Sequence, residues 1–503
     1  MKPFTLTGKE GFCMFKKLLA PPGKKPRLSD AEVARKYPRY RTQVIISIFV
    51  GYMGYYFVRN TTSILSGILK MSATEIGIIT CASYIAYGVS KFVSGLISDE
   101  SNSKIFLPLG LLLSGIINIF IGVIPSVITS VWLFTIFYLI NGWLQGMGWP
   151  PGARTLVYWF GNKERITYGT IWNLSHNFGG AIAPLLAGAG LALAGNDPLA
   201  QARAAYWFPG IVVCIMAVII YFIQEDTPES VGLPPIEEYK SEEYRESDNA
   251  KLEEDAAAVE MSMGEIVKKY ILPNTKLMWS SLYAALVYIL RYGIVSWTPK
   301  FLATSIQDGG KGITATAGMG GFSFFELGGI AGMLIAGWVS AKLFKNSKPL
   351  TNVACLILTL VLLVAYWFIP AGPEYMIWDF AILIGLGASI YGPVMMVGLY
   401  AMELVPKVAA GAAAGLSGTF SYVGGATVAT LVIGIIVDHL GWVLHLSYSV
   451  SLASPLSFVP YFLVINHLST GMKKNNLLYI NKLPSFLRGV LLFVYFCLVR
   501  TSS

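Results

Sequence analysis

The sequence predicts an all-α membrane protein with twelve transmembrane helices in two six-helix bundles. Of its 503 residues, 54% are hydrophobic and only 13% are charged, whereas soluble domains carry about 25% charged residues. Many apolar runs approach or exceed the roughly 20 residues that a helix needs to cross a lipid bilayer. The two halves of the chain also share motifs in the same order. Together these observations favour two repeated bundles embedded in a bilayer.

The first expected bundle follows a basic segment. Residues 1–41 contain eleven Lys and Arg residues, and an excess of these residues beside the first span predicts a cytoplasmic N-terminus. We therefore interpret 1–41 as a cytoplasmic arm and 42–223 as the first bundle. Its spans are expected at 43–68, 75–98, 105–126, 130–159, 166–194 and 205–223.

An acidic segment separates the two bundles. Residues 224–275 contain 14 acidic and 5 basic residues, a composition typical of a solvated linker, and we place it in the cytoplasm. The second bundle is predicted at 276–466 and is followed by a divergent tail at 467–503. Its spans are expected at 276–303, 318–343, 350–370, 375–402, 410–436 and 442–466.

Composition also argues against several functions. The net charge of +9 lies mainly in the basic arm, and no module of basic and aromatic residues accompanies it, so we expect no nucleic acid as a partner. No nucleotide-binding loop is present. The five cysteines are scattered and odd in number, which predicts neither a disulfide framework nor a metal site. We expect no cofactor and no enzymatic activity.

Two arginines lie within apolar runs. Arg59 comes three residues after Tyr56, and Arg291 comes three residues after Tyr288. A charge inside a membrane span is costly and marks a functional site. Neither motif contains an acidic residue, so the predicted partner is an anionic substrate; the planar guanidinium fork suits phosphate. The competing interpretation is an arginine that extends to the interface or pairs with an internal carboxylate.

The arginine motifs belong to an internal repeat. Gly95-Leu-Ile-Ser98 likewise matches Gly337-Trp-Val-Ser340, and the glycine pair ending at Gly180 matches the pair ending at Gly425. The three spacings are 232, 242 and 245 residues. Such a parallel repeat predicts a substrate site between the halves near the bilayer midplane. Arg59 and Arg291 are expected to face each other there.

Longer strings resemble the organophosphate:phosphate antiporters of the major facilitator superfamily. The resemblance extends from about residue 15 to Trp442 and implies a multi-pass exchanger of the bacterial inner membrane with the major facilitator fold, which we expect to be a monomer. The strings that support it are Gly142-Trp-Leu-Gln-Gly-Met-Gly-Trp-Pro-Pro151, Trp172-Asn-Leu-Ser-His-Asn-Phe-Gly-Gly180, Gly232-Leu-Pro-Pro-Ile-Glu-Glu-Tyr-Lys240, Val287-Tyr-Ile-Leu-Arg-Tyr-Gly293 and Tyr391-Gly-Pro-Val-Met395.

This resemblance implies roles for individual residues. Arg59, Arg291 and His176 would bind the substrate, Lys91 and Glu326 would form a gating ion pair, and Gly95 with Asp99 would belong to a cytoplasmic hinge motif. Without it, His176 is more typical of a residue that hydrogen-bonds neighbouring helices, and the tyrosines are more typical of packing or interfacial anchors. The aromatic residues expected to line the site are Tyr52, Tyr56, Tyr288, Tyr292, Tyr391, Tyr422 and Trp149.

Two positions depart from the family pattern. Asn60 replaces a lysine and Ser296 replaces an acid, and the paired loss indicates that these two groups form an ion pair in relatives. The strings resemble the glycerol-3-phosphate branch more than the hexose-6-phosphate branch. The prediction is an antiporter of glycerol-3-phosphate, or a similar organophosphate, and inorganic phosphate. A hexose-6-phosphate:phosphate antiporter and a membrane sensor that binds sugar phosphates without transport stay open.

Overall fold

The computed structural model describes residues 19–99, 101–240, 261, 263–344, 347–406 and 409–442, and every regular element within them is helical. The longer elements of the first half are α2 (Asp30–Phe57), α4 (Ala73–Asp99), α5 (Ser103–Val123), α7 (Val131–Gln145), α8 (Trp149–Trp159), α9 (Asn162–Leu193) and α10 (Pro198–Ile223). Those of the second half are α15 (Thr275–Val295), α17 (Ala315–Lys342), α18 (Lys348–Trp367), α19 (Met376–Glu403), α20 (Ala410–Thr419) and α21 (Thr427–Leu440). The short α-helices are α3 (Thr61–Ile64), α6 (Pro125–Thr129), α11 (Ile236–Tyr239), α14 (Met263–Ile266) and α16 (Thr298–Ala303).

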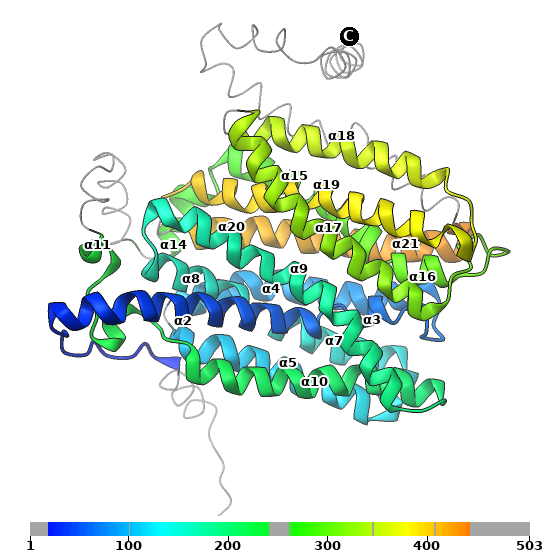
Figure 1. The fold of residues 1–503 in the computed structure, drawn as a ribbon, viewed down its shortest axis with the longest axis horizontal. Coiled ribbons are helices and arrows are strands. Elements are labelled where there is room, and N and C mark those ends of the chain that lie inside the picture. Colours follow the sequence, from blue (N-terminus) through cyan, green and yellow to red (C-terminus); the bar gives the residue numbers. More distant parts are fainter. Residues whose placement is uncertain are drawn as a thin grey trace, which may run out of the picture.

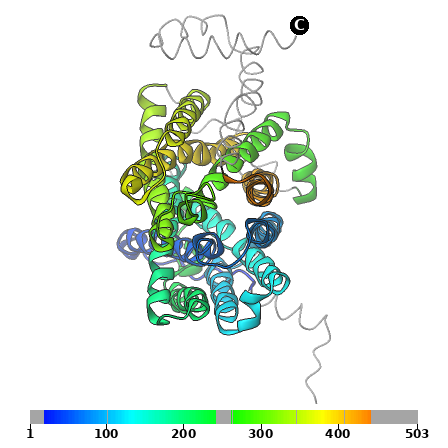
Figure 2. The same cartoon turned by 90° about the vertical axis from the view of Figure 1, so that its right-hand side faces the viewer.

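The helices form two groups that follow the chain order. Helices α2 to α10 pack mainly on one another, and so do α15 to α21. Figure 1 shows the first group, in blue to green, beside the second, in green to orange, and Figure 2 shows the same two groups from the end of the long axis. Between the groups, α4 packs on α20 and α21, and α9 packs on α17.

The predicted all-α membrane fold is confirmed. Nine helices in the described residues are long and apolar enough to cross a membrane. The predicted spans up to residue 436 all fall on described helices. Two of them are not among the nine: the first predicted span, which falls on α2, and the fourth, which is divided into α7 and α8. The twelfth predicted span and the tail lie almost wholly outside the described residues, as does much of the linker.

Several spans predicted as continuous are broken. The first ends at Phe57 and resumes as α3, the fourth breaks between Gln145 and Trp149, and the seventh breaks at Ser296. Proline at the first turns of α8 and α16 favours a new helix start, because proline lacks the N–H that an interior position must donate. The eleventh contains a π-helix at Phe420–Ala426, a distortion that often occurs at functional sites.

The start of the predicted linker is not solvated. Leu233 and Ile236 are only 2% and 1% exposed, and the ring of Tyr239 stacks on Tyr37 of α2 at 3.8 Å between centroids. Arg27 also donates a hydrogen bond to Glu238 at 2.5 Å. The sequence prediction was wrong here because scattered apolar residues in an acidic segment find partners on α2 that no local pattern indicates.

The two ends of the molecule differ. We call the end at which α2 begins the arm side, and the end with α3 and α16 the far side (Figure 1). On the far side the halves are in contact: Lys300 donates to the carbonyl oxygen of Met71 at 2.8 Å. A Cβ added to Gly77 of α4 would lie 2.8 Å from the Thr430 carbonyl oxygen of α21, so only glycine permits this close approach.

Candidate functional site

Arg59 lies in the break between α2 and α3 and is 4% exposed. Its Nε donates to Oε1 of Gln145 at 3.0 Å. The guanidinium carbon lies 4.0 Å from the ring centroid of Tyr56 and 4.6 Å from that of Tyr87. Its Nη1 and Nη2 are buried and have no hydrogen-bond acceptor among the described residues. Because unsatisfied buried donors are costly, this group is suited to an anion.

Arg291 has a different environment near the end of α15. Its Nε and Nη2 donate to the hydroxyl of Tyr391 at 3.1 and 2.8 Å. Nη2 also lies 3.9 Å from Oε1 of Glu326. Tyr391 in turn donates to that carboxylate at 2.5 Å. The sequence motif of Arg291 contains no acidic residue, but α17 brings a carboxylate to it, which is the internal pairing that the competing interpretation expected.

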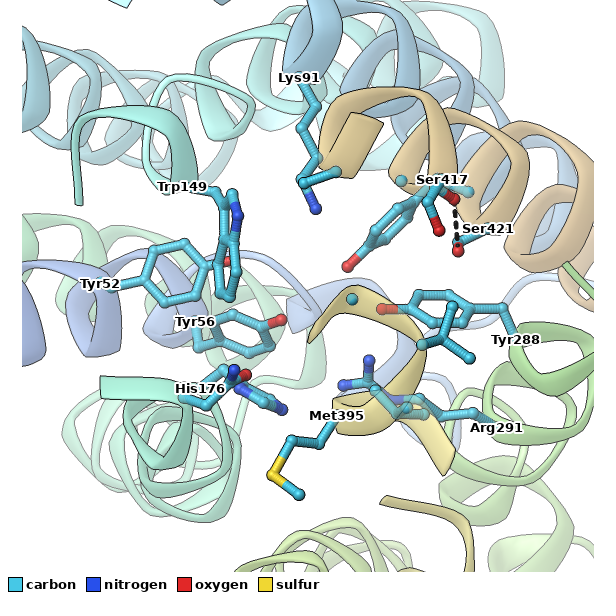
Figure 3. A pocket seen from close by; sticks show the side chains of 17 residues that line it. Tyr52, Tyr56, Lys91, Trp149, His176, Tyr288, Arg291, Met395, Ser417 and Ser421 are labelled. Atoms are coloured by element: carbon cyan, nitrogen blue, oxygen red, sulfur yellow. Dashed lines mark hydrogen bonds between the residues drawn. The ribbon is translucent and has the colours of Figure 1, made fainter. Parts of the chain in front are cut away.

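A cavity lies between the two halves. Its walls come from α2, α4, α8, α9, α15, α19, α20 and the π-helix at Phe420–Ala426. Figure 3 shows Arg291 and His176 near Tyr56, with Lys91 entering from another wall. Lining residues such as Gly398 and Ala414 lie toward the arm-side ends of α19 and α20. The cavity therefore extends toward the arm side, where α4 and α20 still join the halves through a hydrogen bond from Thr419 Oγ1 to the Gly88 carbonyl oxygen at 3.0 Å.

His176 of α9 lines this cavity. Its ring centroid lies 5.5 Å from those of Tyr56 and Tyr391. The imidazole forms a hydrogen bond with the backbone of Asn173, and its buried Nε2 has no hydrogen-bond partner among the described residues. This nitrogen is therefore free to meet an oxygen of a bound molecule.

Lys91 does not pair with Glu326 in this conformation, and the gating role of the two residues stays a prediction. The Lys91 ammonium lies 5.0 Å from the ring centroid of Trp149 and 5.8 Å from that of Tyr422. No ion pair of Lys91 is present among the described residues. Glu326 instead accepts hydrogen bonds from Tyr391 and, at 2.8 Å, from Asn177. The two side chains project from different helices into separate surroundings.

The structure brings most of the predicted site residues to one place, although their roles remain predictions. Those that line the cavity are Tyr52, Tyr56, Lys91, Trp149, His176, Tyr288, Arg291 and Tyr422. Those that lie outside the lining are Arg59, Tyr292, Tyr391 and Glu326. Arg59 is covered by tyrosine rings, so it does not face Arg291 across open space as the repeat suggested.

The two departures from the family pattern adjoin one tyrosine. The hydroxyl of Tyr84 donates to Oδ1 of Asn60 at 3.2 Å and lies near Ser296 of the other half, whose buried Oγ has no hydrogen-bond partner among the described residues. Its ring centroid lies 4.7 Å from that of Tyr292. Positions 60 and 296 therefore flank a common neighbour, with neutral contacts where the sequence comparison implied a lost ion pair.

The predicted hinge motif lies apart from the cavity, near the arm-side end of α4. A Cβ added to Gly95 would meet nothing within 4 Å, and Asp99 is the last residue of the helix. No contact described here tests their role, which stays a prediction.

Sequence reasoning missed several polar residues around the site. Gln145 binds Arg59, and Asn177 binds Glu326 across the halves. Ser417 and Ser421 line the cavity near Lys91 (Figure 3). A search for polar side chains inside apolar spans would have found Gln145 and Asn177. The serines come to the cavity beside the π-helix, for which the sequence holds no clear signal.

Comparison with known proteins identifies the family. The model of the major facilitator superfamily matches residues 44–429. The chain belongs to the major facilitator superfamily. No group of metal-ligating side chains occurs in the described part of this superfamily member.

Individual relatives show which members of the superfamily the chain is similar to. The chain is 40% identical to the glycerol-3-phosphate transporter of Haemophilus influenzae, over 82% of this chain and 89% of that protein. It is 39% identical to the glycerol-3-phosphate transporter of Bacillus subtilis, over 83% and 90%. A solved bacterial homologue of the lysosomal transporter Spinster shares the fold, with a TM-score of 0.66 at 13% identity, over 87% of this chain and 99% of that one. These relatives are transporters, not enzymes.

Proposed function

We propose that this chain is a secondary active antiporter of the bacterial inner membrane that imports glycerol-3-phosphate, or a similar organophosphate, in exchange for inorganic phosphate. The relatives named as glycerol-3-phosphate transporters support this substrate class. The observation that most supports a phosphate site is Arg59, whose two terminal nitrogens are buried without an acceptor among the described residues. A phosphate group offers the oxygens that such a fork binds.

In this proposal the anion joins the two halves. Arg59 comes from the first half, Arg291 comes from the second, and His176 adds an imidazole ring at the cavity wall. A bound phosphate would draw on both charges, and this lowers the cost of closing the halves around them. The rocking motion would then open the far side and close the arm side, which alternates access to one site.

The same proposal assigns the sides of the membrane. The basic arm precedes α2, and the positive-inside rule places such a segment in the cytoplasm. The arm side is therefore proposed to be cytoplasmic, and the conformation described here is proposed to be inward-open. An empty carrier would have to close with the charge of Arg59 still uncompensated, so exchange is favoured over net transport of one substrate.

Phosphate counterflow in proteoliposomes tests this function. Wild-type vesicles loaded with phosphate should accumulate labelled phosphate, and Arg59→Lys should lower this exchange about ten- to hundredfold, because an ammonium cannot donate two parallel hydrogen bonds. Arg203→Lys is the matched control, since among the described residues Arg203 donates only to the carbonyl oxygens of Gly122 and Val123, away from the cavity. Full exchange by Arg59→Lys would refute the phosphate site.

A competition series identifies the organic substrate. Glycerol-3-phosphate should inhibit labelled phosphate uptake at lower concentration than hexose-6-phosphates do. The reverse order would indicate a hexose-6-phosphate antiporter. Saturable phosphate binding without any counterflow would indicate a sensor and refute the antiport proposal.

A further inference from the structure

Polar side chains on one face of α7 contact the break between α2 and α3. Tyr138, Asn141 and Gln145 are spaced three and four residues apart and therefore lie on one side of the helix. All three are buried. Their contacts are Tyr138 OH with Thr62 N at 2.9 Å, Asn141 Nδ2 with Val58 O at 3.2 Å, and Gln145 Oε1 with Arg59 Nε at 3.0 Å. Helix α7 thus fixes both the backbone around Arg59 and the guanidinium itself.

The orientation of the Gln145 amide follows from its partner. The Nε of Arg59 can only donate, so the amide must present its oxygen to it. The Nε2 of Gln145 then points elsewhere, and this buried atom has no acceptor among the described residues. Two hydrogen-bonded side chains therefore carry three buried donor nitrogens that have no acceptor among the described residues. These nitrogens are Gln145 Nε2, Arg59 Nη1 and Arg59 Nη2.

We propose that Gln145 is a further phosphate-binding residue, which holds the Arg59 guanidinium through Oε1 and donates to the phosphate through Nε2. This inference rests on the proposed function. The Nε contact leaves the two terminal nitrogens of the guanidinium available, which is the pair that binds two oxygens of one anion. The amide adds a donor whose charge is zero, so it binds the oxygens without adding a second positive charge to the empty site.

The contrast with Arg291 explains why an amide serves here. Arg291 lies 3.9 Å from the Glu326 carboxylate, which offsets part of its charge. A carboxylate at position 145 would offset Arg59 in the same way and compete with the substrate. Glutamine fixes the guanidinium as a carboxylate would, but it leaves the charge for the anion.

Phosphate binding to the purified full-length protein tests this proposal. Gln145→Leu removes both amide contacts and should raise the Kd for inorganic phosphate about ten- to hundredfold. Gln145→Glu keeps an acceptor for Arg59 Nε in the same shape, so the protein should fold normally while Kd rises at least as much. Thr135→Val is the matched control, because it removes another α7 hydrogen bond, from Thr135 Oγ1 to the Val131 carbonyl oxygen, ten residues before Gln145 and away from Arg59. It should leave Kd within twofold.

A double-mutant cycle separates binding from a purely structural role. If Gln145 acts with Arg59 on one anion, the effects of Gln145→Leu and Arg59→Lys should be clearly less than multiplicative in the double variant. A Kd within twofold of wild type for Gln145→Leu, or multiplicative effects in the cycle, would overturn this inference and leave the proposed function standing. Absence of phosphate binding and exchange in the wild type would overturn both.

Discussion

The first turn of α4 provides a test of the conformational change. Ser72 and Glu75 form a capping box, in which Glu75 N donates to Ser72 Oγ at 3.1 Å and Ser72 N donates to Glu75 Oε2 at 2.8 Å. The next two donors are satisfied from the other half. Ala73 N and Thr74 N donate to the two carboxylate oxygens of Asp438, at 3.0 and 2.7 Å. This contact joins the two halves on the far side, and the proposed rocking motion requires it to break.

Substitution of Asp438 by asparagine weakens the contact selectively. Asparagine offers one acceptor oxygen where aspartate offers two, and it removes the negative charge at a helix N-terminus. Capping contacts contribute roughly 0.5–2 kcal/mol and such charges 0.3–1 kcal/mol. Asp438 is exposed, so we expect a loss of about 1 kcal/mol. Because 1.4 kcal/mol corresponds to a tenfold change, the ratio of far-side-open to far-side-closed molecules should rise about fivefold.

Distance measurements between spin labels detect this shift. Lys70 and Gln307 are exposed on the far side, in the first and second halves, and cysteines there accept labels once the native cysteines are replaced. Asp438→Asn should increase the population at the longer distance about fivefold. Glu75→Gln is the matched control, because its capping partner Ser72 moves with α4. Equal shifts in both variants, or none in Asp438→Asn, would refute the reasoning.

Two further predictions concern ion pairs outside the cavity. Lys311 and Asp379 form a buried ion pair, with 3.0 Å between Nζ and Oδ1. Lys311→Met should lower the free energy of unfolding by about 3 kcal/mol or more, because it leaves the buried carboxylate unpaired. Adding Asp379→Asn should recover over half of the loss in melting temperature. Glu164 contacts Arg41 and Lys240 near α2. Burial alone would raise the pKa of Glu164, but these cations lower it below its ordinary value. This stabilisation is therefore present above about pH 4.3 and lost as the pH falls through the lowered pKa, so hydrogen exchange at residues 228–240 should rise in acid and, at neutral pH, in Glu164→Gln.

The sequence was most informative where a chemical requirement is local. A charged residue in an apolar run is anomalous in isolation, so Arg59 and Arg291 could be found without a structure. The repeat then placed them in corresponding positions of two bundles. The cavity beside Arg291 and His176 agrees with that prediction, although Arg59 lies behind Tyr56.

The partners of these residues could not be predicted, because they depend on tertiary contacts. Glu326 lies on α17, which packs on α19, and its carboxylate comes within 3.9 Å of Arg291 Nη2, whereas the family resemblance paired it with Lys91. The helix breaks are a second case. Nothing at Val58 resembles a breaker residue, and the break is held by Asn141 from α7. Local propensity contains no information about such a contact.

The tyrosines around the arginines explain how the site can exist without its anion. Each guanidinium lies over the faces of several rings, and each such contact contributes roughly 0.5–2 kcal/mol. Burying a charge costs several kcal/mol, so the rings reduce this cost without removing it. Glu326 lowers the remaining cost for Arg291, whereas the only hydrogen-bond partner of Arg59 among the described residues is the neutral Gln145. The uncompensated cost is therefore concentrated at Arg59, and an anion gains most there. The rings are Tyr52, Tyr56 and Tyr87 at Arg59, and Tyr288, Tyr292 and Tyr391 at Arg291.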